Sequence, residues 1–158
     1  MRVADEPVNQ ELIERWRSGE VLHVDGIAFP SGVVTLMTSF TMRTGTTIRC
    51  HAQPLADTSV ASLLEYDESI WVPVTTLDSL GWTPAIKIVC GEGPMGNEGF
   101  VAATEPQSNF PLWVLFSSHS NPFTALSREG DHIVAEAGYG QSWRIPVAEP
   151  TRFSIADD

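Results

Sequence analysis

The segment NFPLWVLFSSHSNPF, residues 109–123, carries the strongest structural signal in this chain. It contains five consecutive apolar residues, Leu112 to Phe116, in which aromatic and branched side chains predominate. A run of this kind predicts a strand that is buried on both of its faces. The tail that follows, Ser117 to Phe123, is polar, and polar groups inside a core need hydrogen-bond partners. We therefore expect the tail to leave the sheet as a structured turn.

Two other segments have helical patterns. Residues 8–18 place apolar side chains near helical spacing, with glutamates early, arginines late and Gly19 as a C-terminal cap, which is the arrangement that the helix dipole favours. Residues 57–66 predict a second short helix, capped by Asp57 or Ser59. The first helix is expected to pack on a sheet.

Most of the remaining chain has β character, because short apolar and β-branched runs alternate with turn residues. Asp25-Gly26 predicts a hairpin turn, residues 127–131 predict a charged turn, and Pro73 restricts its strand to an edge or a loop. Residues 77–82 are ambiguous. The expected strands are 21–24, 27–29, 33–43, 46–52, 70–74, 84–90, 100–104, 112–116, 132–137, 142–147 and 151–155.

This pattern predicts a single globular domain, residues 1–158, of the α+β class. We expect a strand-dominated antiparallel or mixed sheet with one N-terminal helix and a second short helix. Because the strands are closely spaced along the chain, a meander is the simplest topology.

The composition is acidic, with 20 acidic and 9 basic side chains and a net charge of −11. Such a surface repels nucleic acid and anionic membranes and attracts a basic partner, although acidity also favours solubility alone. Cys50 and Cys90 are expected to be free, buried thiols. Neither a signal peptide nor a membrane span is visible, so a cytoplasmic location is expected.

The chemical motifs are weak. The glycine-rich loop GEGPMGNEG between Gly91 and Gly99 lacks the Gly-Lys-Ser/Thr of a phosphate-binding loop, and its two glutamates would repel phosphate. His119 lies among serines that could act as nucleophiles, but no Gly-x-Ser-x-Gly motif accompanies them. We favour a wide hairpin loop and a hydrogen-bonded turn over a nucleotide site and a hydrolase site. No spacing of His, Cys or carboxylates indicates a metal or cofactor.

Several short motifs in residues 91–155 carry a resemblance to a known group of proteins. They are GFVA at 99–102, LWVLF at 112–116 followed by SNPF at 120–123, and SWRIPV at 142–147. This combination resembles small bacterial immunity proteins, which neutralise the toxin domains of contact-dependent inhibition and other polymorphic toxin systems. The resemblance implies an inhibitor, not an enzyme, that blocks a cognate toxin domain by direct occlusion. Many such toxins are basic nucleases, which an acidic partner would suit.

The contact surface of such an inhibitor would consist of exposed positions, and we expect Glu92, Glu98, Glu129 and Asp131 to belong to it. Two other hypotheses remain open. A small enzyme or ligand-binding domain would have a pocket near His119 or the loop between Gly91 and Gly99. A structural or oligomer-forming domain would have a large apolar surface patch.

Overall fold

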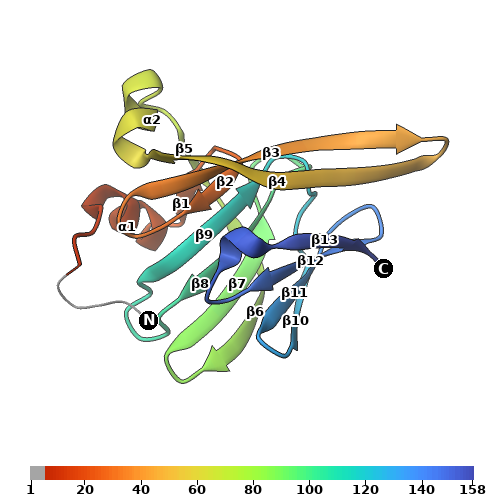
Figure 1. Ribbon diagram of the computed structural model, residues 1–158. Coiled ribbons are helices and arrows are strands. Elements are labelled where there is room, and N and C mark those ends of the chain that lie inside the picture. The colour runs from red at the N-terminus through yellow and green to blue at the C-terminus, as the bar shows by residue number, and fades with distance from the viewer. Residues whose placement is uncertain (1–5) are drawn as a thin grey trace.

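The computed structural model describes residues 6–158, and their architecture confirms a strand-dominated α+β fold (Figure 1). All strand pairs in this part of the chain are antiparallel. The strands are β1 (Glu20–Leu22), β2 (Gly26–Ala28), β3 (Val33–Thr44), β4 (Thr47–Ser59), β5 (Trp71–Pro73), β6 (Thr75–Thr83), β7 (Ile86–Glu92), β8 (Gly99–Thr104), β9 (Pro111–Ser117), β10 (Ala125–Glu129), β11 (His132–Glu136), β12 (Gln141–Pro146) and β13 (Ser154–Asp157).

The predicted buried strand, β9, is the middle strand of a seven-stranded sheet with the order β4-β3-β2-β9-β8-β7-β6. Its side chains alternate between two hydrophobic clusters, as a strand's geometry requires. Trp113 and Leu115 belong to one cluster, whereas Val114 and Phe116 belong to another. The sheet is therefore covered on both faces, as the apolar run predicts.

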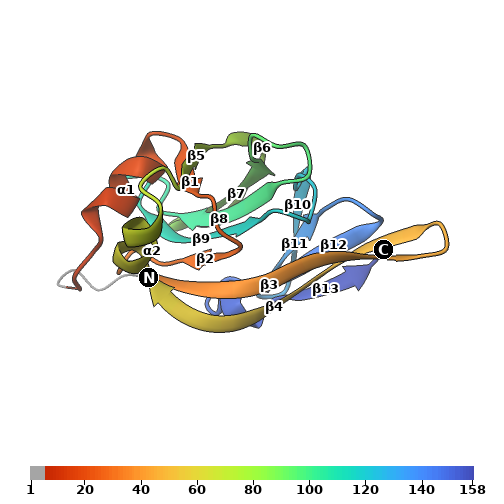
Figure 2. The same cartoon turned by 90° about the horizontal axis from the view of Figure 1, so that it is seen from above.

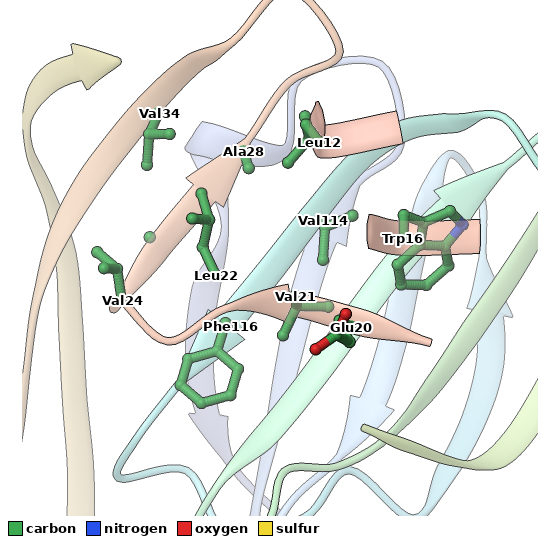
Figure 3. A pocket seen from close by; sticks show the side chains of 11 residues that line it. Leu12, Trp16, Glu20, Val21, Leu22, Val24, Ala28, Val34, Val114 and Phe116 are labelled. Atoms are coloured by element: carbon green, nitrogen blue, oxygen red, sulfur yellow. The ribbon is translucent and has the colours of Figure 1, made fainter. Parts of the chain in front are cut away.

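Helix α1 (Gln10–Arg17) and the small β1-β5 sheet cover one face of the large sheet (Figure 2). The side chain of Asn9 caps α1 by accepting a hydrogen bond from the backbone N–H of Leu12 at 2.9 Å. Trp16 packs edge-on against Phe100 with ring centroids 6.0 Å apart. Figure 3 shows Trp16 and Val21 from this layer beside Val114 of β9.

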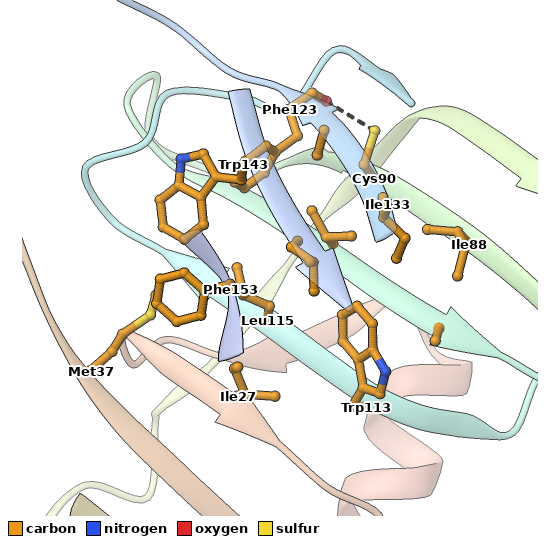
Figure 4. Close-up of a cluster of buried hydrophobic side chains, with 14 of the residues drawn as sticks. Ile27, Met37, Ile88, Cys90, Trp113, Leu115, Phe123, Ile133, Trp143 and Phe153 are labelled. Atoms are coloured by element: carbon orange, nitrogen blue, oxygen red, sulfur yellow. Dashed lines mark hydrogen bonds between the residues drawn. The ribbon is translucent and has the colours of Figure 1, made fainter. Parts of the chain in front are cut away.

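The second sheet, with the order β10-β11-β12-β13, covers the opposite face. At the centre of this core Trp143 stacks on Phe153, with centroids 5.2 Å apart, and meets Phe123 edge-on at 5.3 Å (Figure 4). Phe123 ends the polar tail, so the tail itself delivers an aromatic ring to the core. The 3-10 helix η1 (Pro150–Arg152) leads into β13.

The second helix, α2 (Val60–Tyr66), follows β4 directly, and Ser59 is its cap, accepting a hydrogen bond from the N–H of Ser62 at 3.1 Å. The prediction is confirmed, with Ser59 rather than Asp57 as the capping residue. Both α-helices are short, at eight and seven residues. Among residues 6–158, no helix has the length and apolar character needed to cross a membrane.

The predicted hairpin at Asp25-Gly26 is wrong. Strand β1 pairs with β5, whereas β2 pairs with β3 and β9, so the two segments belong to different sheets. Gly26 does not form a turn. Its lack of a side chain lets the backbone of β3 approach closely, because a Cβ atom at position 26 would lie 2.6 Å from the carbonyl oxygen of Thr35. The Asp25 carboxylate instead accepts a hydrogen bond from the backbone N–H of Ser118.

Three other boundaries differ from the prediction. Most of the charged segment 127–131 lies in β10, where the Arg128 guanidinium stacks 4.0 Å from the Trp82 ring centroid. Residues 151–152 belong to η1 and not to the last strand. Strand β4 continues to Ser59, because an edge strand tolerates the missing N–H of Pro54.

We predict that Trp113→Ala lowers the free energy of unfolding by about 3–5 kcal/mol, because it empties a buried site and removes a hydrogen bond. Trp113 is 3% exposed, and its indole N–H donates to the Val147 carbonyl at 2.9 Å. Urea denaturation measures the change. Tyr66→Ala is the matched control, since that ring is 91% exposed and should change stability by less than about 0.5 kcal/mol.

Candidate functional site

The structure brings together the two segments that the sequence singles out, the polar tail and the glycine-rich loop. The N–H of Asn121 donates to the Asn97 carbonyl at 2.9 Å, and that of Phe123 donates to the Gly91 carbonyl at 3.1 Å. Gly99 fits tightly beneath the tail, since a Cβ there would lie 2.5 Å from the Asn121 carbonyl oxygen. The loop is the connection of an antiparallel hairpin, β7-β8, as expected.

A chain of hydrogen bonds runs through the tail from Asp25 to His119. The Ser118 hydroxyl lies 2.9 Å from the Asp25 carboxylate and 2.9 Å from the Nδ1 atom of His119. In a catalytic triad the histidine stands between the serine and the carboxylate, so that it can take the serine proton. Here the serine stands in the middle. This order favours the hydrogen-bonded turn over a hydrolase site.

Glu98 is buried, with 3% of its surface exposed, and the expectation that it lies on an exposed contact surface is wrong. Its carboxylate accepts a hydrogen bond from the Met95 N–H at 3.0 Å and contacts Nε2 of His23 at 2.5 Å. The His23 ring also meets Phe116 edge-on, with centroids 5.4 Å apart. A buried carboxylate needs such partners, so Glu98 shapes the loop.

The other expected contact residues remain on the surface, but Glu92 lies on a different element from Glu129 and Asp131. Glu92 is half-buried at one end of β7, while Glu129 and Asp131 lie on the β10-β11 hairpin. Glu129 forms two hydrogen bonds with Arg144, at 2.6 and 2.9 Å, and these bonds hold the pKa of the Glu129 carboxyl below its usual range. Asp131, with its side chain 92% exposed, contacts His132 at 2.8 Å.

A groove of about 390 Å³ that the sequence does not indicate lies beside β4, at the edge of the large sheet. The Gln141 side chain accepts from the Cys50 N–H at 2.8 Å and donates to the Cys50 carbonyl at 3.2 Å. It thus makes the two backbone hydrogen bonds that a neighbouring strand would make. Phe40 stacks on His51 with centroids 5.3 Å apart. The groove is lined by Thr38, Phe40, Arg49, Cys50, His51, Ala52, Gln53, Gln141, Ile155 and Asp157.

The space between α1, β1 and β9 is a small apolar gap in the packing (Figure 3). Its volume is about 10 Å³, which is about the room that one water molecule occupies. Leu12, Leu22 and Phe116 are among its lining residues. This cavity is too small for a substrate. Within residues 6–158, no group of three or more His, Cys, Asp or Glu side chains is placed to hold a metal ion.

Two consecutive segments of the chain each carry charges of one sign only. Residues 26–56 contain Arg43 and Arg49 and no carboxylate, whereas residues 57–86 contain no lysine or arginine. The acidic segment carries Asp57, Glu65, Asp67, Glu68 and Asp78. All side chains from position 65 to 69, at the end of α2, are exposed. The overall net charge does not reveal this separation, because both halves of the chain are acidic.

Both cysteines are free and buried. Burial raises the pKa of the Cys50 thiol from its ordinary value of 9.0 to about 11, and that of Cys90 to about 12. We predict that neither thiol of the folded protein reacts with a disulfide reagent near neutral pH, because the thiolate is the reactive form. Both should react once the protein is unfolded in denaturant.

The same pKa shifts predict a loss of stability in alkali. Both thiols stay neutral in the folded protein, whereas the unfolded chain releases their protons above about pH 9. Their contribution should therefore be complete below pH 9 and should fall as the pH approaches the folded values. Urea denaturation across this range, with Cys50→Ala/Cys90→Ala as the reference, measures the effect. An identical alkaline slope in the reference would contradict it.

For Glu98 we predict a structural effect. Glu98→Ala should lower the free energy of unfolding by about 1–3 kcal/mol, because it removes a buried carboxylate that accepts from the Met95 N–H and contacts the His23 ring. Glu98→Gln retains an acceptor oxygen and should lose less. Urea denaturation measures both variants, with Glu92→Ala as the matched control at a half-buried position. Equal losses for Glu92 and Glu98 would contradict the role of the buried carboxylate.

Residues 6–158 thus contain three candidate features. They are the hydrogen-bonded polar cluster in the tail that follows β9, the groove beside β4 and the exposed acidic end of α2. No family model, no curated protein and no solved structure matches this chain.

Proposed function

We propose that this protein is an immunity-type inhibitor, which binds a basic toxin domain and blocks it without catalysis. The observation that carries the proposal is the acidic segment 57–86, which contains five carboxylates and no basic residue. A basic nuclease presents lysine and arginine to phosphate groups. An acidic surface that pairs with those side chains would cover the site where the nucleic acid binds.

Four of the arginines elsewhere are placed so that they neutralise carboxylates locally. Arg15 pairs with Glu20 at 3.1 Å, and Arg144 pairs with Glu129 at 2.6 Å. Arg49 lies 2.8 Å from Asp157 and Arg152 lies 3.7 Å from Glu149. The acidic segment includes no such cation. Asp78 lies apart from the others, half-buried in β6, where it accepts from the Leu126 N–H at 2.8 Å. The exposed carboxylates of Glu65, Asp67 and Glu68 at the end of α2 are therefore the ones available to steer a basic partner and to pair with it.

The exposed end of α2 also supplies an aromatic anchor. Tyr66 is 91% exposed and lies between Glu65 and the pair Asp67-Glu68. Tyrosine is among the residue types that most often dominate binding energy in interfaces. We therefore place the main contact with the toxin at this end of α2. Glu129 and Asp131, two of the four contact residues expected from the sequence, lie on the β10-β11 hairpin and give a competing surface that can be tested in parallel.

The test of the function is co-purification with the C-terminal domain encoded by the gene immediately upstream, followed by titration calorimetry at two salt concentrations. We expect a tight one-to-one complex that weakens as salt rises, because screening reduces attraction between opposite charges. If both proteins are folded and no heat of binding appears, that pairing is wrong. A tight complex without salt dependence would contradict the charge mechanism.

Two double charge reversals decide which surface binds. Glu65→Lys/Glu68→Lys and Glu129→Lys/Asp131→Lys change the net charge equally, so a difference in affinity between them reports the position of the charges and not their number. We expect the α2 variant to lose the larger share of affinity, and Tyr66→Ala to weaken binding roughly tenfold. A larger loss in the second variant would assign the contact to the β10-β11 hairpin instead.

A further inference from the structure

The outer part of the β3-β4 hairpin is a ribbon without a cover. Every residue from 40 to 47 is exposed, and we call this segment the arm. Figures 1 and 2 both show it projecting beyond the two sheets. A two-stranded ribbon in water is marginally stable by itself. A second surface that packs on the arm would stabilise it.

The arm exposes apolar side chains. Phe40 is 47% exposed and Met42 is 52% exposed, although both are large and hydrophobic. The base of the same hairpin exposes two more, Val33 at 40% and Leu55 at 65%. Tyr66 follows at the end of α2. Exposed apolar side chains therefore occur at both ends of the hairpin.

The charges along the hairpin have opposite signs at its two ends. Arg43 lies at the tip, and no carboxylate occurs in residues 26–56. Arg49 also lies toward the tip, but it is paired with Asp157 at 2.8 Å, so Arg43 supplies the charge of the arm. The acidic helix α2 is attached at the base, where Ser59 pairs with Val33 and the Val60 N–H donates to the Gly32 carbonyl at 2.8 Å. The hairpin therefore has a basic, apolar tip and an acidic, apolar base. Its twelve-residue strand β3 spans about 40 Å between them.

We propose that two copies of this chain associate through these hairpins in an antiparallel, twofold arrangement, with the arm of each copy on the α2 end of the other. A rod with opposite charges at its ends is complementary to a second copy turned end for end. One twofold axis then satisfies both contacts at once. The apolar side chains at the tip of one hairpin meet those at the base of the other.

Strand β4 leaves this side of the hairpin accessible, because it is the last strand of the seven-stranded sheet. The free edge of β4 is nevertheless protected against backbone pairing with a strand of another molecule. Gln141 occupies both backbone groups of Cys50, and Pro54 has no N–H to donate. The two hairpins should therefore meet through their side chains and not through a continuous ladder of backbone hydrogen bonds.

The test is sedimentation of the full chain alone over a range of protein and salt concentrations. We expect a dimer at low salt that dissociates toward the monomer at high salt, because the contact depends on exposed opposite charges. A monomer under all conditions would overturn the proposal. The inference does not depend on the toxin partner, since only one protein is present. A failure here leaves the calorimetric test of the proposed function unaffected.

Charge exchange tests the arrangement itself. Arg43→Glu should weaken the dimer on the order of tenfold, and so should Glu65→Lys/Glu68→Lys. A mixture of these two variants should form a heterodimer. In that heterodimer the acidic arm of the first variant meets the basic α2 end of the second, while the other contact keeps its native charges on both sides. Circular dichroism checks that each variant is folded.

Matched controls separate this contact from a general effect of charge. Arg152→Glu makes the same change as Arg43→Glu at a side chain that is 74% exposed, and Glu129→Lys/Asp131→Lys matches the α2 double reversal. Both controls should retain the dimer. A dimer that survives Arg43→Glu, or a mixture of the two charge variants that stays monomeric, would overturn the contact between arm and α2.

Discussion

Burial of β9 on both faces is the constraint on which the other elements depend. Its side chains alternate between two cores, so the sheet needs a cover on each side. Helix α1 and the β1-β5 sheet supply one cover, and the β10-β13 sheet supplies the other. The remaining strands extend the sheet from β9 in both directions. Loss of a large side chain from this strand therefore affects more than one layer.

The polar tail after β9 is the segment through which the chain leaves the core. The chain must leave the core, and the polar groups of the tail need partners as it does so. Asp25, the glycine-rich loop and the serines of the tail provide these partners. The serines of the tail, His119 and Asp25 are thus hydrogen-bonded to one another at the end of the sheet.

The β3-β4 hairpin links the two proposals. Its base carries the acidic end of α2, and its tip carries Arg43 and exposed apolar side chains. The arm of a second copy and a basic toxin would then compete for the same acidic surface. In the dimer, the acidic surface of each copy would be covered by the arm of the other. A basic partner that binds this surface more tightly would displace the arm and separate the two copies. The affinity of the dimer would thereby set the threshold for inhibition.

The sequence by itself determined the α+β class, the position of β9, both helices and most strand segments, because hydrophobic period, capping residues and turn residues act over a few neighbouring positions. Only the tertiary structure decided that Asp25 binds Ser118, 93 residues away, and that Glu98 is buried against His23, 75 residues away. The groove at β4 and the opposite charges at the two ends of one hairpin likewise depend on which strands become neighbours. Such pairings follow from the packing of the whole chain, and no local pattern specifies them.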